Sequence, residues 1–275
     1  LSIATSLIAG SIRVSIPIAF AALGGTLSER SGIINMGLEG TMLMGAFFGL
    51  FVVKFKSDEY IIGVALNIFA GGLTVFLLRT IFGVAGAFSG NDQMPIQPLP
   101  KIRIPLIENI PILGDLLSGN TLLVYVSWIL VAVSYVLIYK TPIGFWMRAA
   151  GEHPGSLRAA GRSPEKMKYL ASILCGLFSG LAGAHLSLGY LTMFTENMSA
   201  SRGFIAVACV IFGMSNPPRV FLAALLFGFI EALGLRMQSF NVTSLAPYLV
   251  TVVMMVCVVW RGERRRKRLA RLEKL

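Results

Sequence analysis

The densest group of polar side chains in the sequence lies between two apolar stretches, from Ser28 to Gly40. It includes Glu29, Arg30, Asn35 and Glu39, whose groups can donate or accept hydrogen bonds. Asn35 and Glu39 are four residues apart, so they share one face if the segment is helical. Three glycines within nine residues would loosen or break a helix there. The cluster therefore either lines a polar pathway or joins neighbouring helices, with Glu29 and Arg30 as an interfacial pair.

Five more polar residues lie within or beside apolar stretches: Asn67, His185, Glu196, Arg202 and Glu231. Glu196 and Arg202 flank a short polar segment, where they could form an ion pair or an outer gate. His185 stands alone on an apolar face, which is more typical of a packing residue than of a ligand. The carboxylate of Glu231 requires a charged or polar partner within the membrane. Arg236 is close to it in sequence but would not lie on the same face of the helix.

Motifs that would indicate catalysis are missing from the sequence. It contains neither a phosphate-binding G-x-x-x-x-G-K-[ST] loop nor the H-E-x-x-H or G-x-S-x-G motifs of hydrolases. Cys175, Cys209 and Cys257 lack the spacing of metal ligands and resemble small buried hydrophobes. We therefore expect no metal and no cofactor in this chain, and no enzyme activity of its own. A membrane enzyme using the Glu29 and Glu39 carboxylates is the remaining alternative.

The composition indicates that these polar groups are positioned by a membrane protein. Hydrophobic residues make up 55% of the 275 residues and charged residues 13%, whereas a soluble domain carries about 25% charged residues. A chain with so little charge cannot cover a soluble surface, and its apolar stretches approach the roughly 20 residues that a membrane-spanning helix needs. We therefore predict a single transmembrane domain over residues 1–275.

The net charge of +11 is concentrated in two segments. Residues 140–168 hold six basic and two acidic side chains, and the tail 261–275 holds eight and two. Both flank apolar stretches, as the cytoplasmic loops of membrane proteins do. Residues 83–119 carry little charge and are expected outside. The positive charge thus indicates topology and contact with anionic lipid, not nucleic-acid binding.

About eight apolar segments are expected, so the predicted fold class is an all-α polytopic membrane protein with both termini cytoplasmic. In the first segment Arg13 is costly at the membrane centre, so its buried part should start near Val14. Gly203–Met214 is too short to cross and should be a broken or tilted helix. The other predicted spans are Ile33–Val53, Ile61–Phe82, Thr121–Tyr139, Tyr169–Tyr190, Val220–Leu235 and Ser244–Trp260.

Glycine spacing predicts close helix packing. Gly45 and Gly49, and likewise Gly176 and Gly180, are one helical turn apart. Small residues at this spacing allow helix backbones to approach each other in lipid. We therefore expect a tight helix bundle.

Several stretches resemble permeases of ATP-binding-cassette (ABC) importers, in the family of branched-chain amino acid, ribose and nucleoside permeases. The run from Ala21 to Gly32, continuing to Gly40, is closest to the nucleoside branch, often labelled simple-sugar permeases. Residues 151–161 are similar to the cytoplasmic coupling loop of the family. Residues 187–190 and 202–213 resemble its later helices, so the resemblance covers nearly the whole chain in order.

The coupling loop departs from the family pattern in part. Members of the family usually carry Asn where this chain has His153, and an Ala pair where it has Ser156 and Leu157. The external residues 90–119 have no family counterpart in their details. These departures put individual residue roles in doubt but not the role of the loop.

The resemblance implies that residues 140–168 form a cytoplasmic loop that couples the permease to a partner ATPase. The coupling residues would be Glu152, His153, Pro154, Arg158 and Gly161. Pro154 can begin a short helix and Gly161 can end it. ATP would be used by the partner, so the chain would supply a pathway and a lever.

The substrate pathway would be lined by Asn35, Glu39 and Asn67. A weakly polar pathway with so few fixed charges suits neutral polar solutes better than ions. The resemblance implies a tandem-domain ATPase, a second, different permease chain and an extracellular substrate-binding lipoprotein, in the bacterial cytoplasmic membrane. Nucleosides are the expected substrate, and ribose or another simple sugar is the alternative. An ion-coupled secondary transporter, which would need no docking loop, is the alternative from another class.

Overall fold

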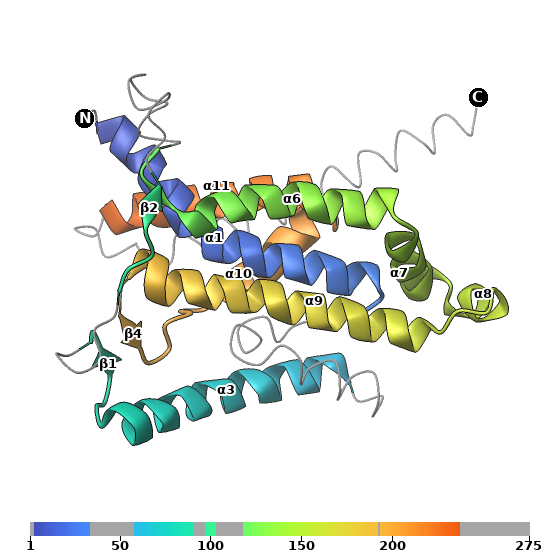
Figure 1. The fold of residues 1–275 in the computed structure, drawn as a ribbon, viewed down its shortest axis with the longest axis horizontal. Coiled ribbons are helices and arrows are strands. Elements are labelled where there is room, and N and C mark those ends of the chain that lie inside the picture. The colour runs from blue at the N-terminus through green and yellow to red at the C-terminus, as the bar shows by residue number, and fades with distance from the viewer. Residues whose placement is uncertain (1–2, 34–57, 91–96, 103–117, 192, 237–275) are drawn as a thin grey trace, which may run out of the picture.

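The computed structural model describes residues 3–33, 58–90, 97–102, 118–191 and 193–236, most of them helical (Figure 1). Five helices are long and apolar enough to cross a membrane within these residues. They are α1 (Ile3–Arg30), α3 (Glu59–Phe82), α6 (Leu122–Lys140), α9 (Pro164–Ala184) continued by the π-helical turn η2 (His185–Tyr190), and α11 (Pro217–Arg236). The chain is thus a mainly helical, multi-pass membrane protein.

The sixth apolar helix, α10 (Arg202–Phe212), has 11 residues. This length confirms the prediction of a short helix in that segment. The predicted spans at 33–53, beyond Ile33, and at 244–260 lie outside the described residues, as does the basic tail 261–275.

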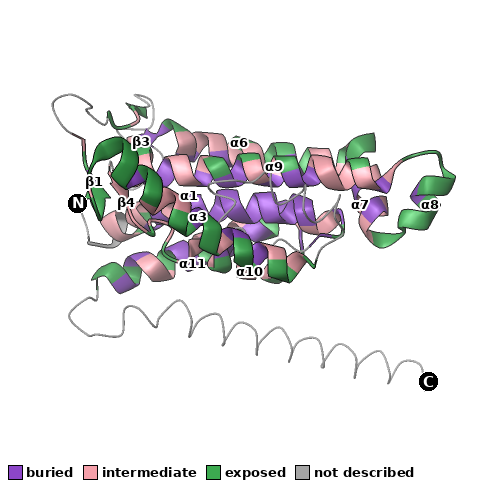
Figure 2. Ribbon diagram, turned by 90° about the horizontal axis from the view of Figure 1, so that it is seen from below, coloured by how far each residue is buried: buried purple, intermediate pink, exposed green. Residues whose placement is uncertain are grey.

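Helix α1 forms the centre of the bundle, in contact with α6, α9, α10 and α11. Every residue from Val14 to Ser28 is buried, which matches the predicted start of the buried part (Figure 2). Arg13, one residue earlier, is half-buried and donates from Nε to Asn120 Oδ1 over 3.2 Å. An apolar circumference suits either a lipid-facing or an enclosed helix, and the contacts with four other helices show that α1 is enclosed.

Two glycines bring α1 close to its neighbours. A Cβ at Gly24 would lie 2.8 Å from the carbonyl oxygen of Cys175 in α9, and one at Gly228 in α11 would lie 2.3 Å from Ser15 Cβ. By contrast, no atom lies within 4 Å of a Cβ placed at Gly180. The predicted role of Gly180 in close packing is therefore not met among the described residues, while Gly45 and Gly49 lie outside them.

The two ends of the bundle differ. At one end α7 (Pro142–Glu152) and α8 (Pro154–Ala159) project beyond the long helices (Figure 1). At the other end two antiparallel strand pairs join connecting segments: β1 (Ala87–Phe88) with β4 (Phe194–Thr195), and β2 (Lys101–Ile102) with β3 (Asn120–Thr121). These two short strand pairs depart from the predicted all-α fold. They form because connecting segments that meet side by side satisfy their backbone groups by pairing.

The outer surfaces of the long helices are apolar. On α3, Ile61, Ile68 and Phe76 are 69%, 72% and 62% exposed. Large hydrophobic side chains at this exposure are costly in water and favourable in hydrocarbon. The surface therefore supports the membrane setting that the composition predicts.

The α1–α11 contact predicts that Gly228→Ala destabilises the bundle. The added Cβ would clash with Ser15 and push the helices apart, costing about 1–3 kcal/mol. Thermal unfolding of the purified protein in detergent should show a Tm several degrees lower. Gly180→Ala is the control, because its Cβ enters open space and alanine favours the helix. Equal Tm values for both variants would contradict this packing.

Candidate functional site

The short helix α8 has well-defined ends. Pro154 is its first residue, and Gly161 follows it with φ of +76°. The Gly161 N–H donates to the Arg158 carbonyl over 2.9 Å, and the Arg162 N–H donates to the Leu157 carbonyl over 3.1 Å. This pair of bonds is a Schellman motif, which needs a residue in the left-handed region and favours glycine. The predicted start and end of the helix are confirmed.

Helix α8 presents most of its side chains to the outside. Leu157 is its buried residue, whereas Glu152, His153, Pro154 and Arg158 are exposed. Such an anchored but exposed helix can contact another protein without unfolding. The structure therefore places four of the predicted coupling residues on one accessible segment.

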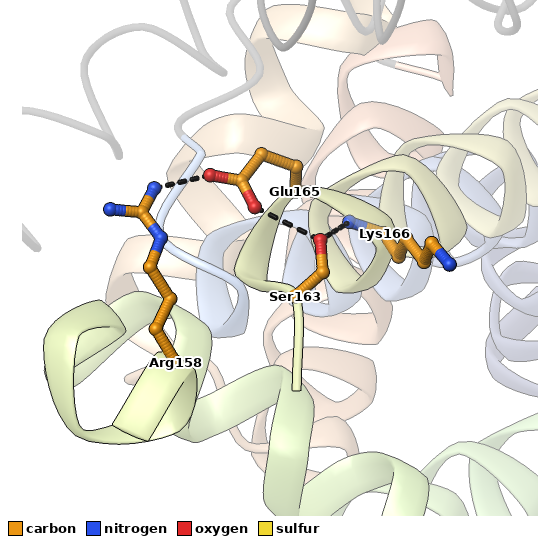
Figure 3. A network of polar contacts seen from close by, with 4 residues as sticks. All are labelled: Arg158, Ser163, Glu165 and Lys166. Atoms are coloured by element: carbon orange, nitrogen blue, oxygen red, sulfur yellow. Dashed lines mark hydrogen bonds and ion pairs between the residues drawn. The ribbon is translucent and has the colours of Figure 1, made fainter. Parts of the chain in front are cut away.

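Polar contacts tie α8 to the first turn of α9 (Figure 3). Arg158 forms an ion pair with Glu165, and Ser163 Oγ donates to Glu165 Oε2 over 2.9 Å. The Lys166 N–H in turn donates to Ser163 Oγ over 3.3 Å, which caps α9. These contacts fix the orientation of α8 relative to a long helix.

The first part of the polar cluster forms the end of α1. Gly32 has φ of +81°, its N–H donates to the Glu29 carbonyl over 2.9 Å, and the Ile33 N–H donates to the Ser28 carbonyl over 3.1 Å. This is a second Schellman motif. It agrees with the prediction that glycine breaks a helix here. The later residues of the cluster, Asn35 and Glu39, lie outside the described part of the chain.

The end of α1 touches the last turn of α7 through two glycine backbones. A Cβ at Gly32 would lie 2.7 Å from Gly151 Cα, and a Cβ at Gly151 would lie 2.7 Å from the Gly32 nitrogen. Neither position has room for a side chain. Because α7 leads directly into α8, this contact joins the exposed helix to the central one.

Arg30 connects the same end of α1 to two other elements. Its Nε donates to the Ser215 carbonyl and its guanidinium to the Tyr139 hydroxyl, each over 2.8 Å. Ser215 and Met214 form the turn between α10 and α11, and both have positive φ. The interfacial pair of Arg30 with Glu29 is not formed; Arg30 instead joins α1, α6 and the α10–α11 turn. Glu29 lies beside it in a cleft of about 340 Å³.

The opposite end of the bundle holds a largely buried ion pair. Arg202 at the start of α10 pairs with Glu231 in α11 at 2.5 Å, and the two side chains are 12% and 16% exposed. Arg202 also donates to the Met198 carbonyl over 3.3 Å. The suggested pair of Arg202 with Glu196 is therefore wrong.

Glu196 has a different role. Its Oε1 accepts from the Gly86 N–H over 3.0 Å, and its own N–H donates to the Gly86 carbonyl over 2.8 Å. These bonds extend the β1–β4 pair. Glu196 thus links the segment after η2 to the end of α3.

A pocket of about 290 Å³ lies at this end. Three segments that are far apart in the sequence line it: the middle of α3, the junction of α9 with η2, and residues 194–199. Asn67, one of the predicted pathway residues, belongs to the α3 wall together with Gly71 and Thr74. Among the described lining residues none is charged.

His185 lies beside this pocket but not in its lining. It is fully buried, and a Cβ at Gly189 would lie 2.6 Å from its Nδ1, so the ring packs against that backbone. Cys175 and Cys209 are also buried. Among the described residues no group of His, Cys, Asp and Glu side chains could hold a metal ion.

Sequence reasoning missed the partner of Glu231 and most of the pocket lining. Arg202 and Glu231 are 29 residues apart and lie on different helices. Phe194, Asn197 and Ser199 lie in a segment without periodicity. The one available signal was the polar character of residues 195–201 between two apolar helices, which marks a segment at a membrane surface or cavity.

The described residues form a multi-pass helical bundle with a short exposed helix at one end and, near the other, a pocket whose described lining carries no charge. Residues 40–259 match the branched-chain amino acid transport system/permease component family. The chain belongs to this family of membrane permeases.

Several of its relatives are permease proteins of ABC transporters. The guanosine permease protein NupQ of Bacillus subtilis is 32% identical, covering 90% of both chains. The putative glucose permease protein TsgC13 of Haloferax volcanii is 32% identical, covering 88% of this chain and 80% of the relative. The nucleoside permease protein NupC of Lactococcus lactis is 28% identical, covering 90% of both chains. No solved structure matches the chain significantly.

The buried ion pair predicts a large effect of Glu231→Gln on stability. The variant leaves the Arg202 charge buried without a counter-charge, which costs about 3–5 kcal/mol. Thermal unfolding in detergent should show a clearly lower Tm, and adding Arg202→Met should recover part of it. Glu165→Gln breaks the exposed pair with Arg158 and should leave Tm nearly unchanged. Equal decreases in Tm for Glu231→Gln and Glu165→Gln would contradict a stabilising buried ion pair between Arg202 and Glu231.

Proposed function

We propose that this chain is a permease subunit of an ATP-driven importer for nucleosides. The observation that carries the proposal is the 32% identity to a guanosine ABC transporter permease over 90% of both chains. The similarity to a nucleoside permease of Lactococcus lactis supports the same substrate class. A simple sugar is the second candidate, because a putative glucose permease is equally identical over 88% of this chain.

The orientation follows from charge. The basic segment 140–168 contains α7 and α8, and we place it in the cytoplasm together with the tail 261–275. The end with β1 and β4 then faces outward. Counting predicted spans outside the described residues, the chain would cross the membrane about eight times with both termini inside.

Coupling to the ATPase would use α8 and the residues around it. Glu152, His153, Pro154 and Arg158 are exposed for docking, and Gly161 ends the helix. The chain carries no phosphate-binding loop, so ATP is bound and hydrolysed by the partner. An ion-coupled transporter would have no use for such a docking helix.

The contacts of the α8 end suggest how movement is transmitted. A displacement of α8 would also displace α7. Because the Gly151 and Gly32 backbones are in direct contact, with no side chain between them, α7 would then displace the end of α1. Arg30 carries it onward to the α10–α11 turn. Packed elements of this kind shift as units between two arrangements.

The remaining partners follow from the faces of the bundle. A second permease chain would cover part of the apolar surface, and an extracellular lipoprotein would deliver the substrate at the β1–β4 end. Asn35, Glu39 and Asn67 would line the pathway, while Glu196 and Arg202 would hold the outer segment in place. The complex would lie in a bacterial cytoplasmic membrane, in contact with lipid, and would involve no nucleic acid.

Uptake into proteoliposomes tests this function. The vesicles contain this chain, the companion permease, the ATPase and the lipoprotein, and uptake of labelled guanosine and labelled ribose is compared with and without ATP at the ATPase face. We expect ATP-dependent uptake of guanosine. Uptake of ribose alone would establish the sugar alternative, and uptake driven by an ion gradient without ATP would contradict the importer class.

The docking surface predicts that Ser156→Arg weakens association with the ATPase. Ser156 is exposed on α8, so a bulky charged side chain there blocks contact without disturbing the core. Co-purification of the ATPase and ATP-dependent uptake should fall at least about tenfold, a loss of roughly 1.4 kcal/mol. Ser89→Arg, at an exposed serine next to β1, is the control for co-purification of the ATPase only, because that end of the bundle faces the proposed lipoprotein. Retained association in both variants would show that α8 is not the docking site.

The backbone contact predicts that Gly151→Ala impairs transport in an assembled complex. Its Cβ would clash with Gly32 and the Arg30 carbonyl, so the ends of α7 and α1 must separate. We expect ATPase co-purification to persist while solute imported per ATP hydrolysed falls several-fold. Gly180→Ala in α9, outside both α8 and the pocket lining, adds a Cβ with no described atom within 4 Å and should behave as wild type. If the Gly151→Ala variant imported as much solute per ATP hydrolysed as wild type, the Gly151–Gly32 contact would not be what couples α7 to α1.

A further inference from the structure

We infer that the pocket between α3, η2 and residues 194–199 is where the permease holds its solute, and that it accepts an uncharged, hydroxyl-rich molecule such as a nucleoside but not a nucleotide. This assignment rests on the proposed function and adds to it a location and a selectivity. The pocket has a volume of about 290 Å³, near the lower end of the roughly 300–1,000 Å³ typical of small-molecule sites.

The position of the pocket suits a solute that arrives from outside. Its lining includes β4, which lies at the end of the bundle opposite α8 (Figure 1). Asn67 and Thr74 lie in the middle third of α3, which runs from Glu59 to Phe82, so the pocket is away from both ends of this helix. Its second wall includes a π-helical turn, a feature that is frequent at functional sites.

The hydroxyl groups of the pocket are arranged to accept hydrogen bonds. Thr74 Oγ1 donates to the Gly71 carbonyl over 2.8 Å, and Ser187 Oγ donates to the Gly183 carbonyl over 3.2 Å. Each hydroxyl has one proton and two acceptor lone pairs. Because both protons are used within their helices, the oxygens offer acceptors to a ligand. A solute with several O–H and N–H donors satisfies them.

The charge and shape of the pocket lining further restrict which solutes the pocket can bind. None of the described lining residues is charged, so these residues offer a phosphate group no cation to offset its desolvation. Phe194, Leu186 and Met198 provide an apolar surface beside the polar groups. A nucleoside combines a flat apolar ring face with ribose hydroxyls and fits both parts, whereas a bare sugar uses only the polar part.

Arg202 and Glu196 hold the third wall of the pocket in place. Arg202, paired with Glu231, donates to the Met198 carbonyl, and Glu196 bonds to Gly86. Met198 is itself in the lining. Both contacts fix the segment 194–199 to neighbouring elements, so Arg202 and Glu196 are positioning residues for the pocket.

Two adjacent glycines of α3 provide a matched test. Gly71 lines the pocket and Gly72 does not, yet a Cβ at either meets no atom within 4 Å. In the reconstituted importer, Gly71→Leu should lower ATP-dependent guanosine uptake at least tenfold, while Gly72→Leu should stay within twofold of wild type. Equal uptake by the two variants would overturn the pocket assignment. Failure of the wild-type complex to import nucleoside would instead overturn the proposed function.

Cysteine labelling measures directly whether a solute occupies the pocket. In the full complex in nanodiscs, Gly71→Cys is labelled with a water-soluble maleimide, and the rate is corrected for that of the native chain. Guanosine should slow the labelling at least threefold, and guanosine monophosphate at the same concentration should not. Absence of labelling, or labelling that guanosine does not slow in a complex that imports it, would overturn the inference. Equal protection by the nucleotide would overturn its selectivity.

Discussion

The close backbone contacts of α1 with its neighbours are the constraint on which the rest of the structure depends. In lipid there is no hydrophobic force between helices, so association relies on packing, and packing improves when backbones approach. Gly24 and Gly228 allow this approach to α9 and α11. The result is a central helix buried from Val14 to Ser28, around which the other elements are placed.

The central helix also connects the two ends of the molecule. At one end Arg13 is bonded to Asn120, next to the β2–β3 pair. At the other end Arg30 and Gly32 contact Tyr139, the α10–α11 turn and Gly151. A buried helix with fixed contacts at both ends transmits displacement along its axis. In the proposed function, α1 would therefore connect the exposed helix α8 mechanically to the pocket region.

Polar groups within the bundle fall into two kinds. Arg202 and Glu231 are charged, largely buried and paired with each other, because an unpaired charge in a low-dielectric region is costly. The pocket, by contrast, is lined by amides, hydroxyls and apolar groups. Such groups can bind a neutral solute reversibly without the large desolvation cost of an ion. The charged pair thus stabilises the bundle, and the neutral polar lining is what the proposed solute site would use for recognition.

The sequence by itself determined the class of the protein, the positions of most long helices and the ends of α8. These depend on local properties: hydrophobic length, the distribution of lysine and arginine, and the backbone preferences of Pro154 and Gly161. Only the tertiary structure decided which glycines form close contacts, that Arg202 pairs with Glu231, and that Asn67 shares a pocket with Ser187. Those facts depend on how helices distant in the sequence are rotated and paired, and the spacing of residues along one helix carries no information about its partner.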